Sequence, residues 1–150
     1  MSATRVPVAL RERVARQARY RCGYRLTAED VVGSAMEIDH LLPEAHGGLT
    51  EEENLWLACS ECYTFKGDRT SALDPLTGDT TPLFNPRQQR LREHFAWTAA
   101  GDYIVGQTPI GRATVAALKL NRPLVVRARR LWVRIGVHPP RDATNEGDDA

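Results

Sequence analysis

The sequence predicts a mixed α+β fold, in which helices and a short β-hairpin pack around a central segment at about residues 36–67. Apolar residues recur at helical spacing near both ends of the chain, and a short alternating strand near Ile38 precedes a Gly-Gly turn. A length of 150 residues corresponds to about one domain. We therefore expect a single domain over residues 1–140, followed by a disordered acidic tail at 141–150.

The first half of the chain is expected to contain short elements. Leu10, Val14 and Ala18 recur four residues apart, which predicts a helix over residues 8–20. Further elements are predicted from alternation, turn residues and a capping box formed by Thr50 and Glu53. They are a loop at 22–34, a strand at 35–42 with Ile38 facing inward, a turn-rich connection at 43–50, a short helix at 51–57 and one or two helical turns at 59–67.

The second half predicts a hairpin and two longer helices. The expected elements are a turn at 74–78, a helix at 85–91, hairpin strands at 94–97 and 103–106, and helices at 108–120 and 123–135. The last helix is expected to bury a stripe of apolar side chains at helical spacing, formed by Leu124, Ala128, Leu131 and Ile135.

The charge is unevenly distributed although the net charge is only +1. Residues 5–25 contain seven arginines and one acidic residue, and residues 127–134 contain four more arginines. This pattern fits either a face that binds phosphates or solvated helix surfaces, and charge alone does not separate the two. No apolar run approaches the roughly 20 residues of a membrane-spanning helix. The N-terminus also lacks the apolar core of a signal peptide, so we expect a cytoplasmic protein with no membrane partner.

Three cysteines, an odd number, argue against a disulfide framework in a chain without a secretion signal. Cys59 and Cys62 have the spacing of one half of a zinc knuckle, and Cys22 is the natural third thiol. Arg25 stands where a fourth cysteine would complete the set. A zinc site and three small buried hydrophobic side chains are therefore both open interpretations.

Asp39 and His40 are adjacent on the predicted strand, and this pair suits the hydrolysis of a phosphodiester. A neutral imidazole can accept a proton from water near pH 7. A carboxylate can hold a divalent cation that neutralises charge on the phosphate. Asn54 follows fourteen residues after His40, and its carboxamide can brace backbone groups or orient the imidazole.

The run Glu37-Ile38-Asp39-His40, with Pro43, Gly47-Gly48, Glu53-Asn54-Leu55, Cys59-x-x-Cys62 and Lys66-Gly67, closely resembles HNH endonucleases of the ββα-metal superfamily. Downstream segments such as Asp74-Pro75-x-Thr77-Gly78 and Leu83-Phe84-Asn85-Pro86-Arg87 are similar to a bacterial subgroup of stand-alone HNH proteins. The resemblance covers about residues 8–138. It implies a ββα-metal finger and a metal-dependent endonuclease that acts on DNA.

The resemblance also implies roles for individual residues. His40 would be the general base, Asn54 would brace the turn, and Asp39 would bind a divalent metal, Mg²⁺ or Mn²⁺, with Ni²⁺ and Zn²⁺ as further options. Cys22, Cys59 and Cys62 would supply three of the four ligands of a structural Zn²⁺. The expected phosphate contacts of the DNA partner are Lys66 and the nearby arginines Arg13, Arg16 and Arg21. The resemblance implies no particular oligomeric state.

Two residues depart from the family pattern. Tyr63 stands where the subgroup has Asn or His as the second metal ligand, and a phenol binds Mg²⁺ poorly unless it is ionised. Tyr63 is therefore either a ligand or a packing residue. Arg25 cannot act as a ligand. Three functional interpretations follow: a metal-dependent DNA endonuclease, a degenerate HNH scaffold that binds nucleic acid or protein, and a structural remnant with neither activity.

Overall fold

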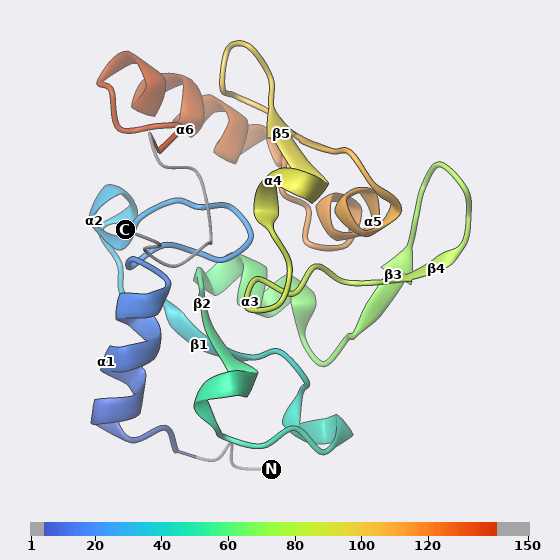
Figure 1. Cartoon of the computed structure of the whole chain (residues 1–150). Coiled ribbons are helices and arrows are strands. Elements are labelled where there is room, and N and C mark those ends of the chain that lie inside the picture. Colours follow the sequence, from blue (N-terminus) through green and yellow to red (C-terminus); the bar gives the residue numbers. More distant parts are fainter. Residues whose placement is uncertain (1–4, 141–150) are drawn as a thin grey trace. The chain divides into compact units, whose positions relative to one another are not determined.

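The computed structural model describes residues 5–140. Contacts divide the chain between Thr70 and Ser71 into two compact units, each of which is described here by itself. Short antiparallel strand pairs and helices make up both units, so the predicted α+β class is confirmed (Figure 1). The single domain predicted for 1–140 stays a prediction, and the predicted acidic tail at 141–150 lies outside the described residues. Over residues 5–140, no helix is both long enough and apolar enough to cross a membrane.

The first unit contains the β-β-α order that the resemblance to HNH endonucleases implies. Its elements are α1 (Val8–Gln17), α2 (Glu29–Val32), β1 (Glu37–His40), the 3-10 turns η1 (Glu44–His46) and η2 (Glu52–Asn54), β2 (Leu55–Ala58) and α3 (Ser60–Lys66).

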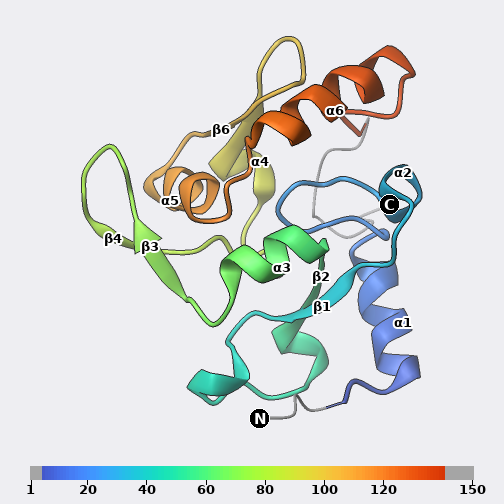
Figure 2. The same cartoon turned by 180° about the vertical axis from the view of Figure 1, so that it is seen from behind.

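Strands β1 and β2 form an antiparallel hairpin that positions the candidate site. Its register runs from Glu37 opposite Ala58 to His40 opposite Leu55. All four residues of β2 are buried. Helix α1 contacts β2 and helix α3 contacts β1, so the hairpin lies between two helices (Figure 1 and Figure 2). The core of this unit therefore holds β1 firmly, including the backbone that carries Asp39 and His40.

The helix predicted at 51–57 is wrong. The capping residues Thr50 and Glu53 predict a helix start, but the chain forms only the single turn η2 and then enters strand β2. Leu55 and Leu57 are fully buried opposite β1, whereas a helix would turn part of this segment toward solvent. Pairing with β1 and burial therefore override the local helix signal.

The second unit contains two further hairpins and the longer helices. Its elements are β3 (Ser71–Leu73), β4 (Thr80–Pro82), α4 (Leu91–His94), β5 (Phe95–Trp97), β6 (Ile104–Gly106), α5 (Pro109–Ala117) and α6 (Pro123–Arg134). The hairpin predicted around residues 100–102 is thus confirmed, as are the helices predicted within 108–120 and 123–135. The β3–β4 hairpin was not predicted.

Two predictions for this unit are wrong. Residues 86–88 form a turn instead of the predicted helix, and a helix begins only at Leu91. The apolar stripe predicted for α6 is exposed, with Leu124, Leu131 and Ile135 at 65%, 59% and 72%. The buried side of α6 instead includes Arg129, which is 0% exposed. Its guanidinium donates to the carbonyl oxygens of Asp102 and Leu120 and lies over the Trp97 ring. The arginine side chain, whose guanidinium is hydrogen-bonded, thus occupies a buried position that the apolar pattern of the sequence assigns to solvent.

Asp74 and Arg112 form a partly buried two-point ion pair between the β3–β4 turn and α5. The guanidinium Nε and Nη2 of Arg112 donate to the two carboxylate oxygens of Asp74 at 2.9 and 2.8 Å. Asp74 is 0% exposed and also accepts from the backbone N–H of Leu76 and the hydroxyl of Thr77. These hydrogen bonds, chiefly those from Arg112, hold the pKa of Asp74 below its usual value.

Acid is therefore expected to weaken this unit through Asp74. Because the folded-state pKa lies below the unfolded value near ~3.9, the stabilisation is present above that value and is lost as the pH falls further. Replacing Asp74 by Asn should lower the melting temperature at neutral pH and reduce its dependence on acid. Melting curves recorded down to about pH 3 would measure both effects. Asp79→Asn, at an exposed position in the same turn, should change neither.

Candidate functional site

Strand β1 presents Asp39 and His40 on opposite sides, as successive residues of a strand must. Asp39 faces the interior and is 3% exposed. The His40 side chain lies at the rim of the hairpin and is 13% exposed. The two residues that the sequence places together therefore have different environments: a buried carboxylate and an imidazole near the surface.

The Asp39 carboxylate is bound on both oxygens by side chains of this chain. Lys66 Nζ lies 3.2 Å from Asp39 Oδ1, and the Tyr24 hydroxyl donates to Oδ2 at 2.9 Å. Lys66 also donates to the backbone carbonyl of His40 at 3.0 Å and is itself 2% exposed. Burial raises the pKa of Asp39, although Lys66 opposes the shift. Burial and the nearby Asp39 carboxylate raise the pKa of Tyr24.

This arrangement argues against the phosphate contact expected for Lys66, because its ammonium group points into the protein. The same arrangement bears on the metal expected at Asp39. The carboxylate already has an ammonium counter-ion, and among residues 5–140 no group of three or more His, Cys, Asp or Glu ligand atoms gathers around it. As arranged, the residues at Asp39 do not fit a divalent cation, which takes several oxygen ligands.

The His40 imidazole is held through one nitrogen. Its Nε2 lies 3.0 Å from Glu44 Oε1 and 2.9 Å from Thr50 Oγ1. If Nε2 carries the proton and donates a hydrogen bond to Glu44, Nδ1 of the neutral ring keeps its lone pair. The carboxylate thereby selects the tautomer that can accept a proton at Nδ1. Sequence analysis missed both partners, although Glu44 is four residues after His40 and next to Pro43.

Asn54 braces the loop that follows β1, as expected for the middle residue of the motif. Its carboxamide oxygen accepts from the Leu42 N–H at 2.8 Å. Its amide nitrogen donates to the carbonyl oxygens of Leu42 and Leu49 at 3.0 and 2.9 Å. Gly48 allows this close approach, because a Cβ there would lie 1.7 Å from the Leu42 carbonyl oxygen. Asn54 therefore positions the loop that carries Glu44, and its side-chain hydrogen bonds go to the backbone of Leu42 and Leu49.

Replacing Asn54 by Ala is expected to loosen this loop. Three backbone groups lose a side-chain partner, but they lie near the surface, where water can replace part of the bonding. We expect a loss of about 1–3 kcal/mol in the free energy of unfolding, with faster amide exchange at Leu42 as the local sign. Urea denaturation and hydrogen exchange would measure the two effects. Unchanged exchange at Leu42 would contradict the bracing role.

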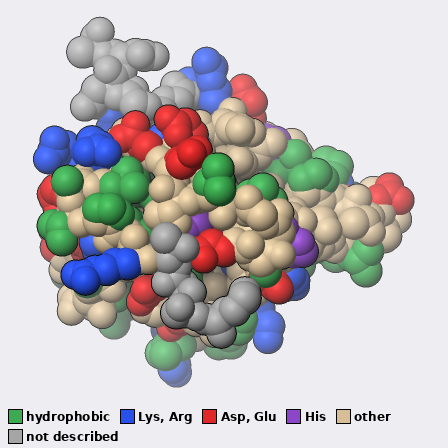
Figure 3. Space-filling view, turned by 90° about the horizontal axis from the view of Figure 1, so that it is seen from below, with side chains coloured by type: hydrophobic (Ala, Val, Ile, Leu, Met, Phe, Trp, Pro, Cys, Tyr) green, Lys and Arg blue, Asp and Glu red, His purple; other side chains and the backbone are tan. Residues whose placement is uncertain are grey.

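Tyr63 lies in the middle of α3 and is 41% exposed. Its position is open enough for a contact with solvent or a partner, but its role as a metal ligand stays a prediction. The Arg13 guanidinium pairs with Glu52 at 2.9 Å, and Arg16 is exposed. Arg21 is half-buried. On the face shown in Figure 3, basic side chains lie among acidic ones, and no patch of a single sign stands out.

The three cysteines come together as predicted. Cys22, Cys59 and Cys62 are buried, and their sulfur atoms all lie within 4.8 Å of one another, so the cluster could hold a metal ion. Burial raises the pKa of Cys22 to about 11. Hydrogen bonds from the other two thiols lower the pKa of Cys59, and the positive charge of Arg25 adds to this effect. The residues supply three of the four ligands of a closed structural zinc site.

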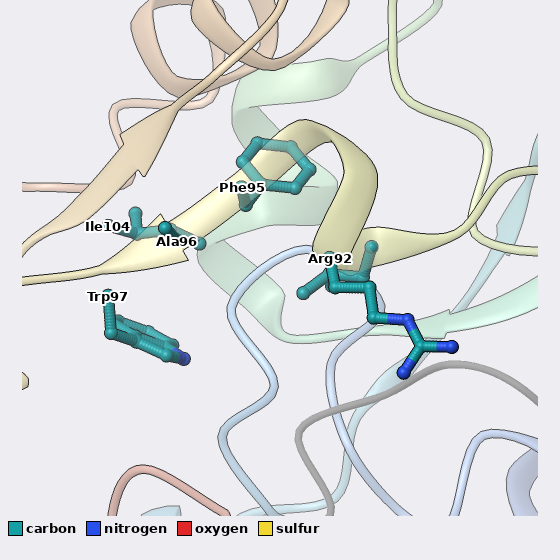
Figure 4. Close-up of a pocket in the computed structure, with 6 residues that line it drawn as sticks. Arg92, Phe95, Ala96, Trp97 and Ile104 are labelled. Atoms are coloured by element: carbon teal, nitrogen blue, oxygen red, sulfur yellow. The ribbon is translucent and has the colours of Figure 1, made fainter.

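A small pocket of about 140 Å³ lies in the second unit and contains none of the predicted site residues. Apolar side chains of α4, β5 and β6 form most of its lining. Figure 4 shows the Trp97 ring at one end of this group and the Arg92 guanidinium at the other.

Comparison with known families agrees with the geometry of the first unit. Residues 20–69 match the family model described as HNH endonuclease. This segment contains the cysteine cluster and the β1–β2–α3 unit, and the resemblance to the HNH family seen in the sequence is confirmed over it. Neither the curated proteins nor the solved structures contain a match to the chain. Membership of the bacterial stand-alone subgroup stays a prediction.

Proposed function

We propose that the chain is an endonuclease that hydrolyses DNA phosphodiester bonds with His40 as the general base. The observation that carries this proposal is the His40–Glu44 pair, with 3.0 Å between Nε2 and Oε1. The carboxylate orients the ring and would stabilise the imidazolium that forms when Nδ1 takes a proton from water. Asn54 would keep Glu44 in place through the loop, so its role would be positioning.

The substrate and the cofactor are inferred from chemistry and family. HNH domains usually use a divalent metal, and Mg²⁺ or Mn²⁺ would need oxygen ligands such as the Asp39 carboxylate. For Asp39 to serve, Lys66 would have to release the carboxylate, since its ammonium now neutralises it. DNA is the proposed partner because exposed arginines such as Arg16 lie on α1 of the same unit.

A specific observation favours a second candidate function. Lys66 occupies the carboxylate that would bind metal, and Tyr63 replaces its partner ligand. A chain that keeps the HNH scaffold but holds no catalytic metal would act as a binding module for nucleic acid or protein. In that case Asp39 and Lys66 would serve only to stabilise the fold.

Cleavage of supercoiled plasmid separates these candidates. Wild-type protein would be incubated with Mg²⁺, Mn²⁺ or Ni²⁺, or with EDTA, beside a His40→Ala preparation that controls for contaminating nuclease. Metal-dependent nicking by the wild type alone supports the endonuclease. Folded protein that retards DNA without cutting it supports the binding module, and restored cutting in Tyr63→Asn would then identify the lost ligand. Folded protein with neither property would support the structural remnant.

A further inference from the structure

A closed zinc site has four protein ligands, whereas the cysteine cluster has three. Arg25 follows Cys22 by three residues, where the second cysteine of a Cys-x-x-Cys pair would stand. Arg25 is not a surface residue. The residue is 4% exposed, and its buried Nε has no hydrogen-bond partner among residues 5–140. A guanidinium has five N–H donors and no lone pair for a metal, so it cannot be the fourth ligand.

The ion pair of Arg25 with Glu61 joins two segments of the chain. Its Nη1 lies 3.2 Å from Glu61 Oε2. Arg25 belongs to the turn after Cys22, and Glu61 lies between Cys59 and Cys62 at the start of α3. A zinc ion bound by cysteines of both segments would join the same turn to the same helix start. The ion pair therefore makes the connection that a metal would make.

Other contacts hold the same two segments without a metal. The Gly23 N–H donates to the Leu57 carbonyl at 2.9 Å, which attaches the turn to the end of β2. Within the turn, the Leu26 N–H donates to the Cys22 carbonyl at 2.8 Å. At the helix start, the Cys62 N–H donates to Cys59 Sγ at 3.5 Å. Each segment is thus closed by hydrogen bonds of its own, one of which uses the Cys59 sulfur atom.

We propose that the Arg25–Glu61 ion pair takes the place of the structural metal in this HNH domain and holds the three-cysteine knuckle closed without zinc. Arg25 stands at the sequence position where a fourth cysteine would stand, so three thiols remain for a metal whose structural sites have four protein ligands. The guanidinium connects the turn to α3 through Glu61. The inference does not depend on the proposed nuclease activity.

The first test measures zinc and stability in the full chain. Wild type and Arg25→Cys would be incubated with Zn²⁺, desalted and analysed for zinc per chain, with melting curves recorded before and after EDTA. The proposal expects no stoichiometric zinc and no effect of EDTA on the wild type. Arg25→Cys should bind one zinc per chain and lose thermal stability in EDTA. Arg16→Cys, which adds a thiol at an exposed position of α1, should behave as the wild type does.

The second test measures how much the Arg25–Glu61 ion pair contributes to stability. Glu61→Gln should lower the melting temperature of the wild type but should have little effect in zinc-loaded Arg25→Cys, where the metal makes the connection. Stoichiometric zinc in the purified wild type would overturn the proposal. So would a Glu61→Gln variant that melts at the wild-type temperature, or an Arg25→Cys variant that takes up no zinc.

Discussion

Replacing Lys66 by Met is expected to lower the free energy of unfolding of the first unit by about 3–5 kcal/mol, because it leaves a buried carboxylate without its counter-ion. Methionine keeps most of the length of the lysine side chain, so the change mainly removes the charge and the two hydrogen bonds to Asp39 and His40. The Tyr24 hydroxyl would remain as the one side-chain partner of the carboxylate.

Hydrogen exchange of the β1 and β2 amides measures this effect in the unit that contains the ion pair. Lys119→Met is the matched control, since the chain has only these two lysines and Lys119 is exposed. That control should change stability by no more than about 0.5 kcal/mol. A double variant, Asp39→Asn with Lys66→Met, should recover part of the loss, because it removes both charges and leaves no unpaired charge in the interior. Exchange rates in Lys66→Met equal to those of the wild type would contradict the account.

Local sequence patterns predicted the elements that depend on local signals. The alternation around Ile38 identified β1, and Cys59 with the residues after it identified α3. The ligand spacing also predicted that Cys22 would lie near Cys59 and Cys62, which the sulfur cluster confirms. In these cases the pattern of neighbouring residues and the final packing favour the same structure.

Long-range contacts explain what the patterns could not predict. Residues 55–58 follow capping residues typical of a helix, yet their burial against β1 makes them a strand. Lys66 is twenty-seven residues from Asp39, and no short-range signal indicates that its ammonium turns inward. A lysine in a helix is usually expected at the surface, but here the buried Asp39 carboxylate holds the Lys66 ammonium in the interior.

The second large effect is expected at His40. Replacing it by Ala removes the imidazole that would take the proton from water, so the cleavage rate should fall by a factor of about 10²–10⁴. The His40 side chain is near the surface and its partners Glu44 and Thr50 are on the adjoining loop, so the fold should remain. DNA binding should also remain, since no arginine of α1 is changed.

His46→Ala is the matched control for this substitution. His46 lies six residues after His40 in the same loop region, is exposed, and belongs to η1 together with Glu44. Removing it takes away an imidazole of the same kind from the same surface without touching the His40–Glu44 pair. The control should cut DNA at the wild-type rate.

The most direct test of His40 as the general base is therefore the single-turnover rate of plasmid cleavage, measured with DNA affinity on the same preparations of wild type, His40→Ala and His46→Ala. The account predicts that only His40→Ala loses cleavage, while all three bind DNA equally and remain folded. Cleavage by His40→Ala at the wild-type rate would contradict it.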